Sequence, residues 1–93
     1  MAEFVLRLFI AGNSASSRRA EHNLQRIMAA ITSEGWRAEI IDVLTEPELA
    51  EKAGVIATPT LSYEHSVRPR RIVGDLSDAK RVLEFLGIDK GET

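Results

Sequence analysis

A proline stands at the start of a β-prone run in the stretch Ala57-Thr58-Pro59-Thr60-Leu61. Proline cannot donate to a β-ladder, so it belongs at the first residue of a strand, at an edge or at a bulge. The stretch therefore predicts a bend that leads into a strand at about Thr60. A proline in such a bend is a candidate for a cis peptide bond, although only about 5–6% of X-Pro bonds in folded proteins are cis.

The first part of the chain predicts a strand and a long helix. Residues 4–10 are apolar on both faces except for Arg7, which is typical of a central strand. A helix should follow, capped by Ser16 or Ser17 and ended by Gly35. Its apolar stripe consists of Ala20, Leu24, Ile27, Met28 and Ile31.

A second strand is expected over residues 36–43, with a short helix after it. Arg37 and Glu39 share one face of this strand, which predicts an exposed edge. Thr45 and Glu48 have the spacing of a capping box at the start of the short helix. The inner face of this helix would consist of Leu49, Ala50 and Ala53, with Gly54 as its stop.

The last part of the chain predicts a strand pair followed by a helix. After the third strand, residues 65–69 should form a hairpin loop and residues 70–73 a fourth strand. Gly74-Asp75 should turn out of that strand, and Ser77 should cap the helix. The helix stripe consists of Ala79, Val82, Leu83 and Leu86, with Gly87 as its stop and a frayed tail over residues 88–93.

These elements follow the order β-α-β-α-β-β-α, which predicts an α/β fold. Strands joined through helices should run parallel with right-handed crossovers, so we expect the first three strands to be parallel. The last two strands should form an antiparallel hairpin. The compact arrangement is a single domain over residues 1–93, with a four-stranded mixed sheet and helices on both faces.

Composition narrows the classes of function. The 93 residues contain no cysteine, which excludes disulfides, thiolate metal sites and dithiol redox chemistry. The net charge of −2 gives no global field that would attract nucleic acid or an anionic membrane, and no long apolar window predicts a membrane span. His22 and His65 alone predict no metal site, and no cofactor is expected. A small domain without disulfides is typical of the cytoplasm.

The element order, with a proline opening the third strand, resembles the thioredoxin-like arrangement. Three motifs are more specific. They are Ala11-Gly12-Asn13; Ile41-Asp42-Val43-Leu44 followed by Pro47 and Leu49-Ala50-Glu51; and Ala57-Thr58-Pro59-Thr60-Leu61 with Arg70-Arg71-Ile72-Val73-Gly74-Asp75-Leu76-Ser77. Together they resemble the circadian-clock KaiB family, with spacings that fit from about Phe4 to Leu86.

This resemblance implies a protein that is not an enzyme. It implies binding to a ring-shaped ATPase of the KaiC type, and then to a further clock protein or a histidine kinase. It also implies that the Thr58–Pro59 peptide bond is cis. Two folds are implied for the family: a thioredoxin-like form that binds the partner, and a form with a refolded second half that assembles into tetramers.

The sequence departs from the family pattern at Phe85, where clock-type members carry a glycine. Glycine in a helix interior costs about 1 kcal/mol relative to alanine, so Phe85 removes that cost and adds a large apolar group. The segment between Tyr63 and Arg70 contains one proline, where clock members tend to be proline-rich. We therefore expect a largely monomeric protein that rests in the thioredoxin-like fold.

The resemblance suggests two candidate partner surfaces. The ATPase is expected to contact the short helix and the residues around Pro59, with candidate residues Glu48, Lys52 and Thr58. The exposed strand edge would pair with a strand of a further partner, through Arg37, Glu39 and Ile41. An alternative interpretation is that the charges on this strand only guard the edge.

A third candidate feature is a cluster of arginines, Arg68, Arg70 and Arg71, that looks like a basic patch. Nucleic acid would need more positive charge and more stacking aromatic residues nearby. A solvated hairpin is the favoured interpretation, ahead of a contact with a protein partner and an anion site.

The remaining polar candidates have structural interpretations. Ser14, Ser16 and Ser17 favour helix capping over a phosphate site, because no glycine-rich loop with a lysine is present. Asp42 reads as an acid at the end of a strand. The other residues with an expected structural role are Pro59, Gly74, Asp75 and Phe85.

Two alternative functions remain open. One is a KaiB relative outside the clock that serves a signalling or stress-response kinase, and nothing in the sequence separates it from the clock role. The other is a redox enzyme of the thioredoxin fold. It is disfavoured because the chain has no cysteine and shows no pairing of a nucleophile with a base.

Overall fold

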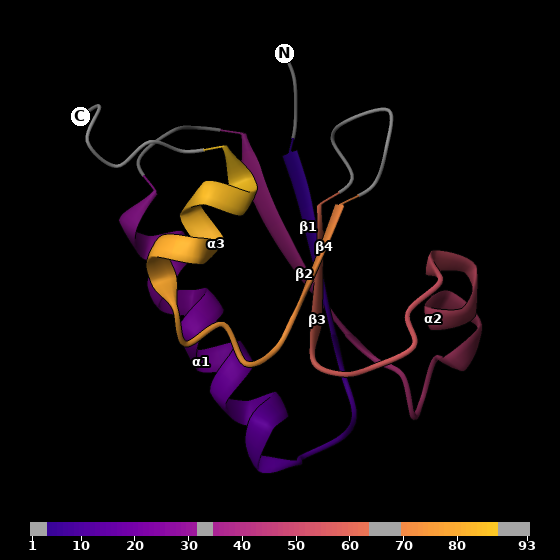
Figure 1. Cartoon of the computed structure of the whole chain (residues 1–93). Helices are drawn as coiled ribbons and strands as arrows, with labels where there is room; N and C mark the ends of the chain where they lie inside the picture. Colours follow the sequence, from indigo (N-terminus) through magenta and orange to yellow (C-terminus); the bar gives the residue numbers. More distant parts are fainter. Residues whose placement is uncertain (1–3, 32–34, 64–69, 88–93) are drawn as a thin grey trace.

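The residues that the structure describes form seven elements in the predicted order. The computed structural model describes residues 4–31, 35–63 and 70–87. Its elements are β1 (Phe4–Ile10), α1 (Ala15–Ala30), β2 (Trp36–Asp42), α2 (Pro47–Ala53), β3 (Thr60–Tyr63), β4 (Arg70–Val73) and α3 (Ala79–Leu86) (Figure 1). The predicted hairpin loop at 65–69 and the predicted tail at 88–93 lie outside the described residues.

One sheet contains the four strands in the order β2-β1-β3-β4. β1 and β2 are parallel, from the pair Phe4–Trp36 to the pair Ile10–Asp42. β3 is antiparallel to both β1 and β4. The sheet is therefore mixed. β1 lies in its interior and β2 at an edge, which confirms the predicted central strand and the predicted edge strand.

The prediction that the first three strands are all parallel is wrong for β3. A parallel return would need a crossover that runs back along the length of the sheet. α2 contains seven residues, and a helix of that length rises only about 10 Å, less than half the length of a strand with as many residues. The chain therefore returns to the sheet from the end at which β2 leaves it, so β3 runs against β1.

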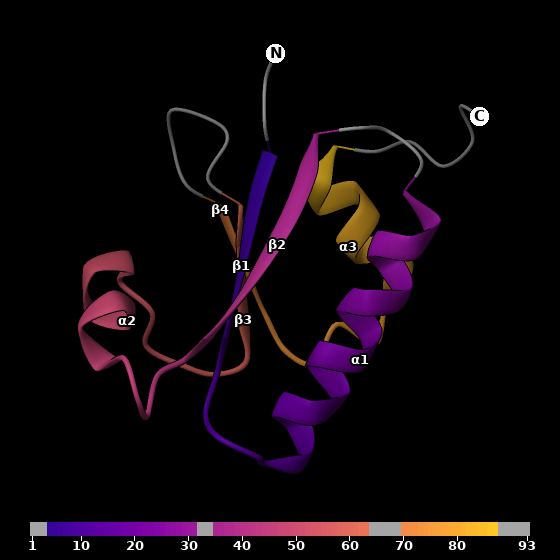
Figure 2. The ribbon, with the colours of Figure 1, turned by 180° about the vertical axis from the view of Figure 1, so that it is seen from behind.

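The two faces of the sheet differ in the core that they cover. α1 and α3 lie together on one face, and α2 lies on the other (Figures 1 and 2). The larger core lies under α1 and α3 and contains Leu6, Leu8, Ile10, Ala20, Leu24, Ile27, Leu61, Tyr63, Ile72, Leu76, Val82 and Leu86. The smaller core lies under α2 and contains Phe9, Ile41 and Ala50. This arrangement confirms the predicted sheet with helices on both faces.

α1 begins after Ser14, so the predicted caps Ser16 and Ser17 are wrong. The Ser14 hydroxyl accepts the N–H of Ser17 at 3.2 Å. Ser17 is buried inside the first turn, where its hydroxyl accepts the N–H of Ala11 at 3.0 Å. α1 ends at Ala30, before the predicted stop at Gly35, and Ile31 follows it in an extended conformation. Gly35 has a positive φ of 97° in the turn that leads into β2.

α2 also begins differently from the prediction. Glu46 is the residue before the helix, and its side chain makes no capping bond. The Thr45 hydroxyl donates to the Asp42 carbonyl at 3.1 Å, so the predicted capping box with Glu48 does not form. Leu49, predicted on the inner face, is 40% exposed. The predicted stop at Gly54 is confirmed, with a left-handed φ of 72°.

α3 is capped by Asp78, and the predicted cap at Ser77 is wrong. The Asp78 carboxylate accepts the N–H of Arg81 at 3.2 Å. The Ser77 N–H instead donates to Asp75 at 3.1 Å, in the side-chain turn that aspartate favours. Gly87 ends the helix in the left-handed region, as predicted.

Candidate partner-binding surfaces

The bend at Pro59 shapes the connection from α2 to β3. The Thr58–Pro59 bond is cis, as the family resemblance implies, and Pro59 is buried. The Thr60 hydroxyl donates to the Ala57 carbonyl at 2.6 Å. The Pro59 carbonyl accepts the N–H of Gly74 at 2.9 Å. Gly74, predicted to be structural, therefore links the end of β4 to this bend.

Asp42 joins two loops at the same end of the sheet. One oxygen of its carboxylate accepts the N–H of Gly12 at 3.0 Å and the N–H of Leu44 at 3.0 Å. A Cβ on Gly12 would lie 3.0 Å from Leu44 Cδ1, and Gly12 has a φ of 59°. The prediction of Asp42 as an acid at the end of a strand is confirmed, and the positive φ at position 12 favours glycine there.

Two large apolar side chains are exposed on the loops that flank α2. Ile56 is 98% exposed, and Leu44 is 69% exposed. Beside Ile56 lies a groove of about 500 Å³, which α2 and the loop before β3 line together. We call the region formed by Leu44, α2 and residues 55–58 the α2 surface. It offers apolar area that a partner can bury.

The α2 surface brings together three of the predicted partner residues. Glu48 and Lys52 are exposed on α2, and Thr58 lines the groove. Sequence reasoning missed Ile56 and Leu44 as surface residues. Both lie in short apolar runs next to strands, and no local pattern separates an exposed member of such a run from a buried one.

The edge of β2 is the second predicted surface. β2 pairs with β1 on one side and with no other described strand. Glu39 bridges two arginines, with 3.1 Å from Arg7 Nε and 3.1 Å from Arg37 Nη1. Ile41 is only 6% exposed and packs beneath α2, so its side chain is not available to a partner.

A second groove, of about 640 Å³, lies between this strand and α2. Arg7 and Glu39 line it from the sheet, and Leu49 and Lys52 line it from the helix. α2 and the edge strand β2 therefore share one groove.

The two described arginines of the predicted patch, Arg70 and Arg71, do not share one surface. Arg68 lies outside the described residues. Neighbouring residues in a strand point to opposite faces, and Arg70 and Arg71 follow that rule. The Arg70 guanidinium lies 5.8 Å from the centre of the Phe85 ring on the face of α3. The Arg71 guanidinium donates to the Ala53 carbonyl at the end of α2.

Phe85 joins α3 to the sheet through an aromatic cluster. Its ring lies edge-on to Tyr63 with centres 6.2 Å apart, and Tyr63 lies 5.6 Å from Trp36. Burial raises the pKa of the Tyr63 hydroxyl above its usual value of 10.0, against the opposing effect of Arg70. The expectation that Phe85 supplies apolar contact in this fold is confirmed.

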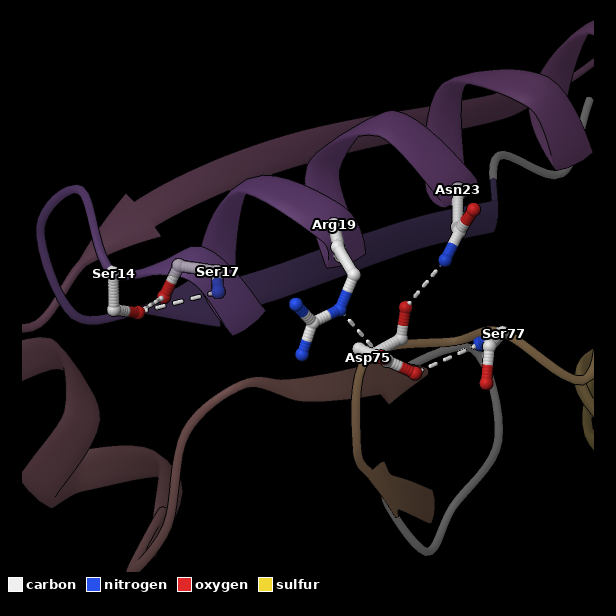
Figure 3. A network of polar contacts seen from close by, with 6 residues as sticks. All are labelled: Ser14, Ser17, Arg19, Asn23, Asp75 and Ser77. Carbon is white, nitrogen blue, oxygen red and sulfur yellow. Dashed lines mark hydrogen bonds and ion pairs between the residues drawn. The ribbon is translucent and has the colours of Figure 1, made fainter.

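Asp75 connects α1 to the segment between β4 and α3 (Figure 3). Its carboxylate accepts from Arg19 Nε at 2.9 Å and from the Ser77 N–H at 3.1 Å. Its backbone carbonyl accepts from the Asn23 side chain at 2.8 Å. The bond from Arg19, with help from Ser77, holds the pKa of Asp75 below its usual value of 3.8. Sequence reasoning missed Arg19 and Asn23, because only the folded topology brings α1 to Asp75.

The described ranges 4–31, 35–63 and 70–87 contain no group of three His, Asp or Glu side chains that could hold a metal ion. Within the same ranges, no helix combines the length and the apolar character that crossing a membrane requires.

The sheet order, the cis-proline before β3 and the absence of cysteine define a thioredoxin-like domain without a dithiol. Two solved structures share this fold. The N-terminal domain of Synechococcus elongatus SasA gives a TM-score of 0.75 at 23% identity over 100% of this chain and 91% of that one. Mitochondrial thioredoxin 3 of Saccharomyces cerevisiae gives 0.72 at 19% identity, over 88% and 76%.

The sequence comparisons identify the family. The KaiB domain matches residues 7–88. The circadian clock oscillator protein KaiB of Prochlorococcus marinus strain NATL2A is 42% identical over 86 residues, 92% of this chain and 78% of its own length. That of Synechococcus elongatus strain PCC 7942 is 40% identical over 89 residues, 96% and 87% of the two chains. The chain therefore belongs to the KaiB family of circadian clock proteins.

Proposed function

We propose that this protein is a non-catalytic clock adaptor that binds a KaiC-type ATPase ring through the α2 surface. Membership of the KaiB family supports the clock role. The observation that carries the choice of surface is Ile56, which is 98% exposed at the rim of a groove. Burying a side chain of this kind in a complex contributes about 1.5–3 kcal/mol.

The polar residues of the α2 surface fit a protein partner. Glu48 and Lys52 are exposed on α2, one of the elements that line the groove, and carry opposite charges. An apolar centre with a charged rim is typical of protein interfaces. Glu48, Lys52 and Thr58 are therefore proposed as contact residues, together with Ile56 and Leu44.

The test is a titration of the fluorescently labelled protein against a KaiC-type ATPase ring, with the mixing kinetics recorded. Ile56→Ser should weaken binding about tenfold or more, because it removes a buried contact of about 1.5–3 kcal/mol. Val73→Ser is the matched control, since Val73 is 56% exposed on β4 and lies outside the α2 surface. Equal affinities for the two variants would contradict the choice of surface.

The kinetics test a further part of the proposal, which is that the protein rests as a monomer in the thioredoxin-like form. Fast, saturable binding is the expected result. Binding that takes hours would mean that most molecules refold first. An absence of binding would favour the alternative role, an adaptor for a signalling kinase outside the clock. Light scattering on the purified protein tests whether it is a monomer. The proposed location of the protein is the cytoplasm.

The edge of β2 is proposed as the site of a second partner, a further clock protein or a histidine kinase. The supporting observation is the position of β2 at the edge of the sheet, with its outer side unpaired by any described strand. Strand addition would use the backbone of β2, flanked by Arg37 and Glu39. Chemical-shift changes confined to residues 36–42 on adding the second partner are the expected result.

A further inference from the structure

α2 is held to the sheet by few contacts of its own. It contains seven residues, of which only Ala50 is buried, and Glu46 gives it no side-chain cap. A helix this short is not stable by itself in water. The small core under α2 adds Phe9 and Ile41 from the sheet. The direction in which α2 faces a partner therefore depends on contacts made from elsewhere in the fold.

Arg71 makes such a contact from the opposite edge strand. β4 and β2 are the two edges of the sheet, and α2 follows β2 in the chain. The Arg71 guanidinium donates to the carbonyl of Ala53, the last residue of α2. The contact therefore ties the end of α2 to β4, a strand that begins 17 residues after Ala53, at Arg70.

The chemistry of the helix end suits an arginine. Carbonyls in the last turn lack partners within the helix, and a cation near them favours the negative end of the helix dipole. Gly54 leaves room for this cation. A Cβ on Gly54 would lie 3.1 Å from Arg71 Nη2 and 3.6 Å from Cζ. The guanidinium is thus packed against the helix end as well as bonded to it.

We propose that Arg71 is a positioning residue for the α2 surface. From β4 it holds the C-terminal end of α2, and so it sets the orientation of the groove and of the loop with Ile56. Arg71 acts through α2 and does not itself contact the partner. This inference rests on the proposed function of the α2 surface, and it replaces the earlier interpretation of Arg71 as part of a basic contact patch.

The first experiment measures α2 itself and needs no partner. Arg71→Gln should speed amide exchange at residues 51–55 about three- to tenfold relative to β1, because a charge-assisted bond to the helix end is lost. Arg71→Lys should have a smaller effect, since it keeps the charge but loses the planar fork. Arg70→Gln is the matched control. It removes the same charge from the neighbouring position, where the side chain faces Phe85, and should leave α2 unchanged.

The second experiment measures binding of the same variants to the KaiC-type ATPase ring. Arg71→Gln should weaken binding about three- to tenfold, because the end of α2 loses the bond that fixes its orientation before the ring binds, while Arg70→Gln should not. Partial recovery in Arg71→Lys is a result that a general loss of stability would not produce. Thermal unfolding followed by circular dichroism shows whether each variant is folded.

The outcomes separate this inference from the function on which it rests. Unchanged exchange in α2 of Arg71→Gln would overturn the positioning role, whatever the binding result. Faster exchange with unchanged affinity would show that Arg71 orders α2 without serving the partner surface, which also overturns it. If the unsubstituted protein does not bind the ring, the proposed function fails. The exchange data then still decide whether Arg71 holds α2.

Discussion

The two faces of the sheet hold their helices by different means. On one face, α1 and α3 cover a continuous apolar core that runs from Leu6 to Leu86. Asp75 adds polar bonds to α1, and Phe85 adds an aromatic contact to α3. On the other face, α2 contributes one residue to a core of only three buried residues, and Arg71 bonds to its end.

This difference assigns the stability of the fold to one face of the sheet and the proposed partner binding to the other. Free energies of local opening within one protein range from near zero to the global value, and binding elements come from the low end. The face with α1 and α3 contains the main core, so it should open only when the whole protein unfolds. The face with α2 contains the exposed Ile56 and the groove, which a partner can use at little cost to the fold.

The largest contrast should come from truncating one leucine on each face. Leu24 is 2% exposed in α1, and Leu49 is 40% exposed in α2. Leu24→Ala should lower the free energy of unfolding by about 2–5 kcal/mol, because it opens a cavity in the main core. Leu49→Ala should change it by less than about 1 kcal/mol. Urea denaturation measures both, and similar losses at the two positions would remove the contrast.

A smaller loss is expected at Phe85, the position at which the family resemblance implies a glycine. Phe85→Gly should lower the free energy of unfolding by about 2–4 kcal/mol, since glycine costs about 1 kcal/mol in a helix and the contact with Tyr63 is lost. Phe85→Ala separates the two causes, because it removes the ring and keeps a good helix former. Backbone chemical shifts of residues 70–73 provide the second measurement. Helical shifts in the unsubstituted protein would contradict a resting state with β4 as a strand.

The smallest effect should be the dependence of stability on the charge of Asp75. The pKa of this carboxyl is lower in the folded protein than its usual value of 3.8. Its stabilising effect is therefore present above about pH 4 and is lost as the pH falls through the folded-state pKa. Asp75→Asn should lower the melting temperature at pH 7, and the gap from the unsubstituted protein should close in acid. A gap that stays constant from pH 7 to acid would show that the Arg19 ion pair is not its cause.

Most of the fold could be predicted from the sequence, because each element has a local signal. Alternation identified residues 4–10 as an interior strand, and charges on Arg37 and Glu39 identified an edge. The direction of β3 was missed, because it depends on how far α2 carries the chain. The caps were assigned to the wrong residues because several serines and acids near each helix start are equivalent in sequence, and the structure uses Ser14 and Asp78.

The partner surface was harder to predict than the fold. Glu48, Lys52 and Thr58 came from the family resemblance, and their contact with a partner stays a prediction: Glu48 and Lys52 are exposed on α2, and Thr58 lines the groove beside it. Ile41 was predicted as a contact at the exposed strand edge, but it is buried, because its strand position turns it under α2. The separation of Arg70 and Arg71 onto opposite faces follows from strand alternation, and sequence reasoning grouped them only because they are adjacent.

The central claim, that α2 is held less firmly than the face with α1 and α3, can be tested by native-state hydrogen exchange of the unsubstituted protein. We predict that amides of α2 exchange by local opening, at a free energy at least about 1.4 kcal/mol below that of β1 and α1, which is a tenfold faster rate. Amides of β1 and α1 should exchange at the global free energy of unfolding. Equal opening free energies for α2 and β1 would contradict the claim.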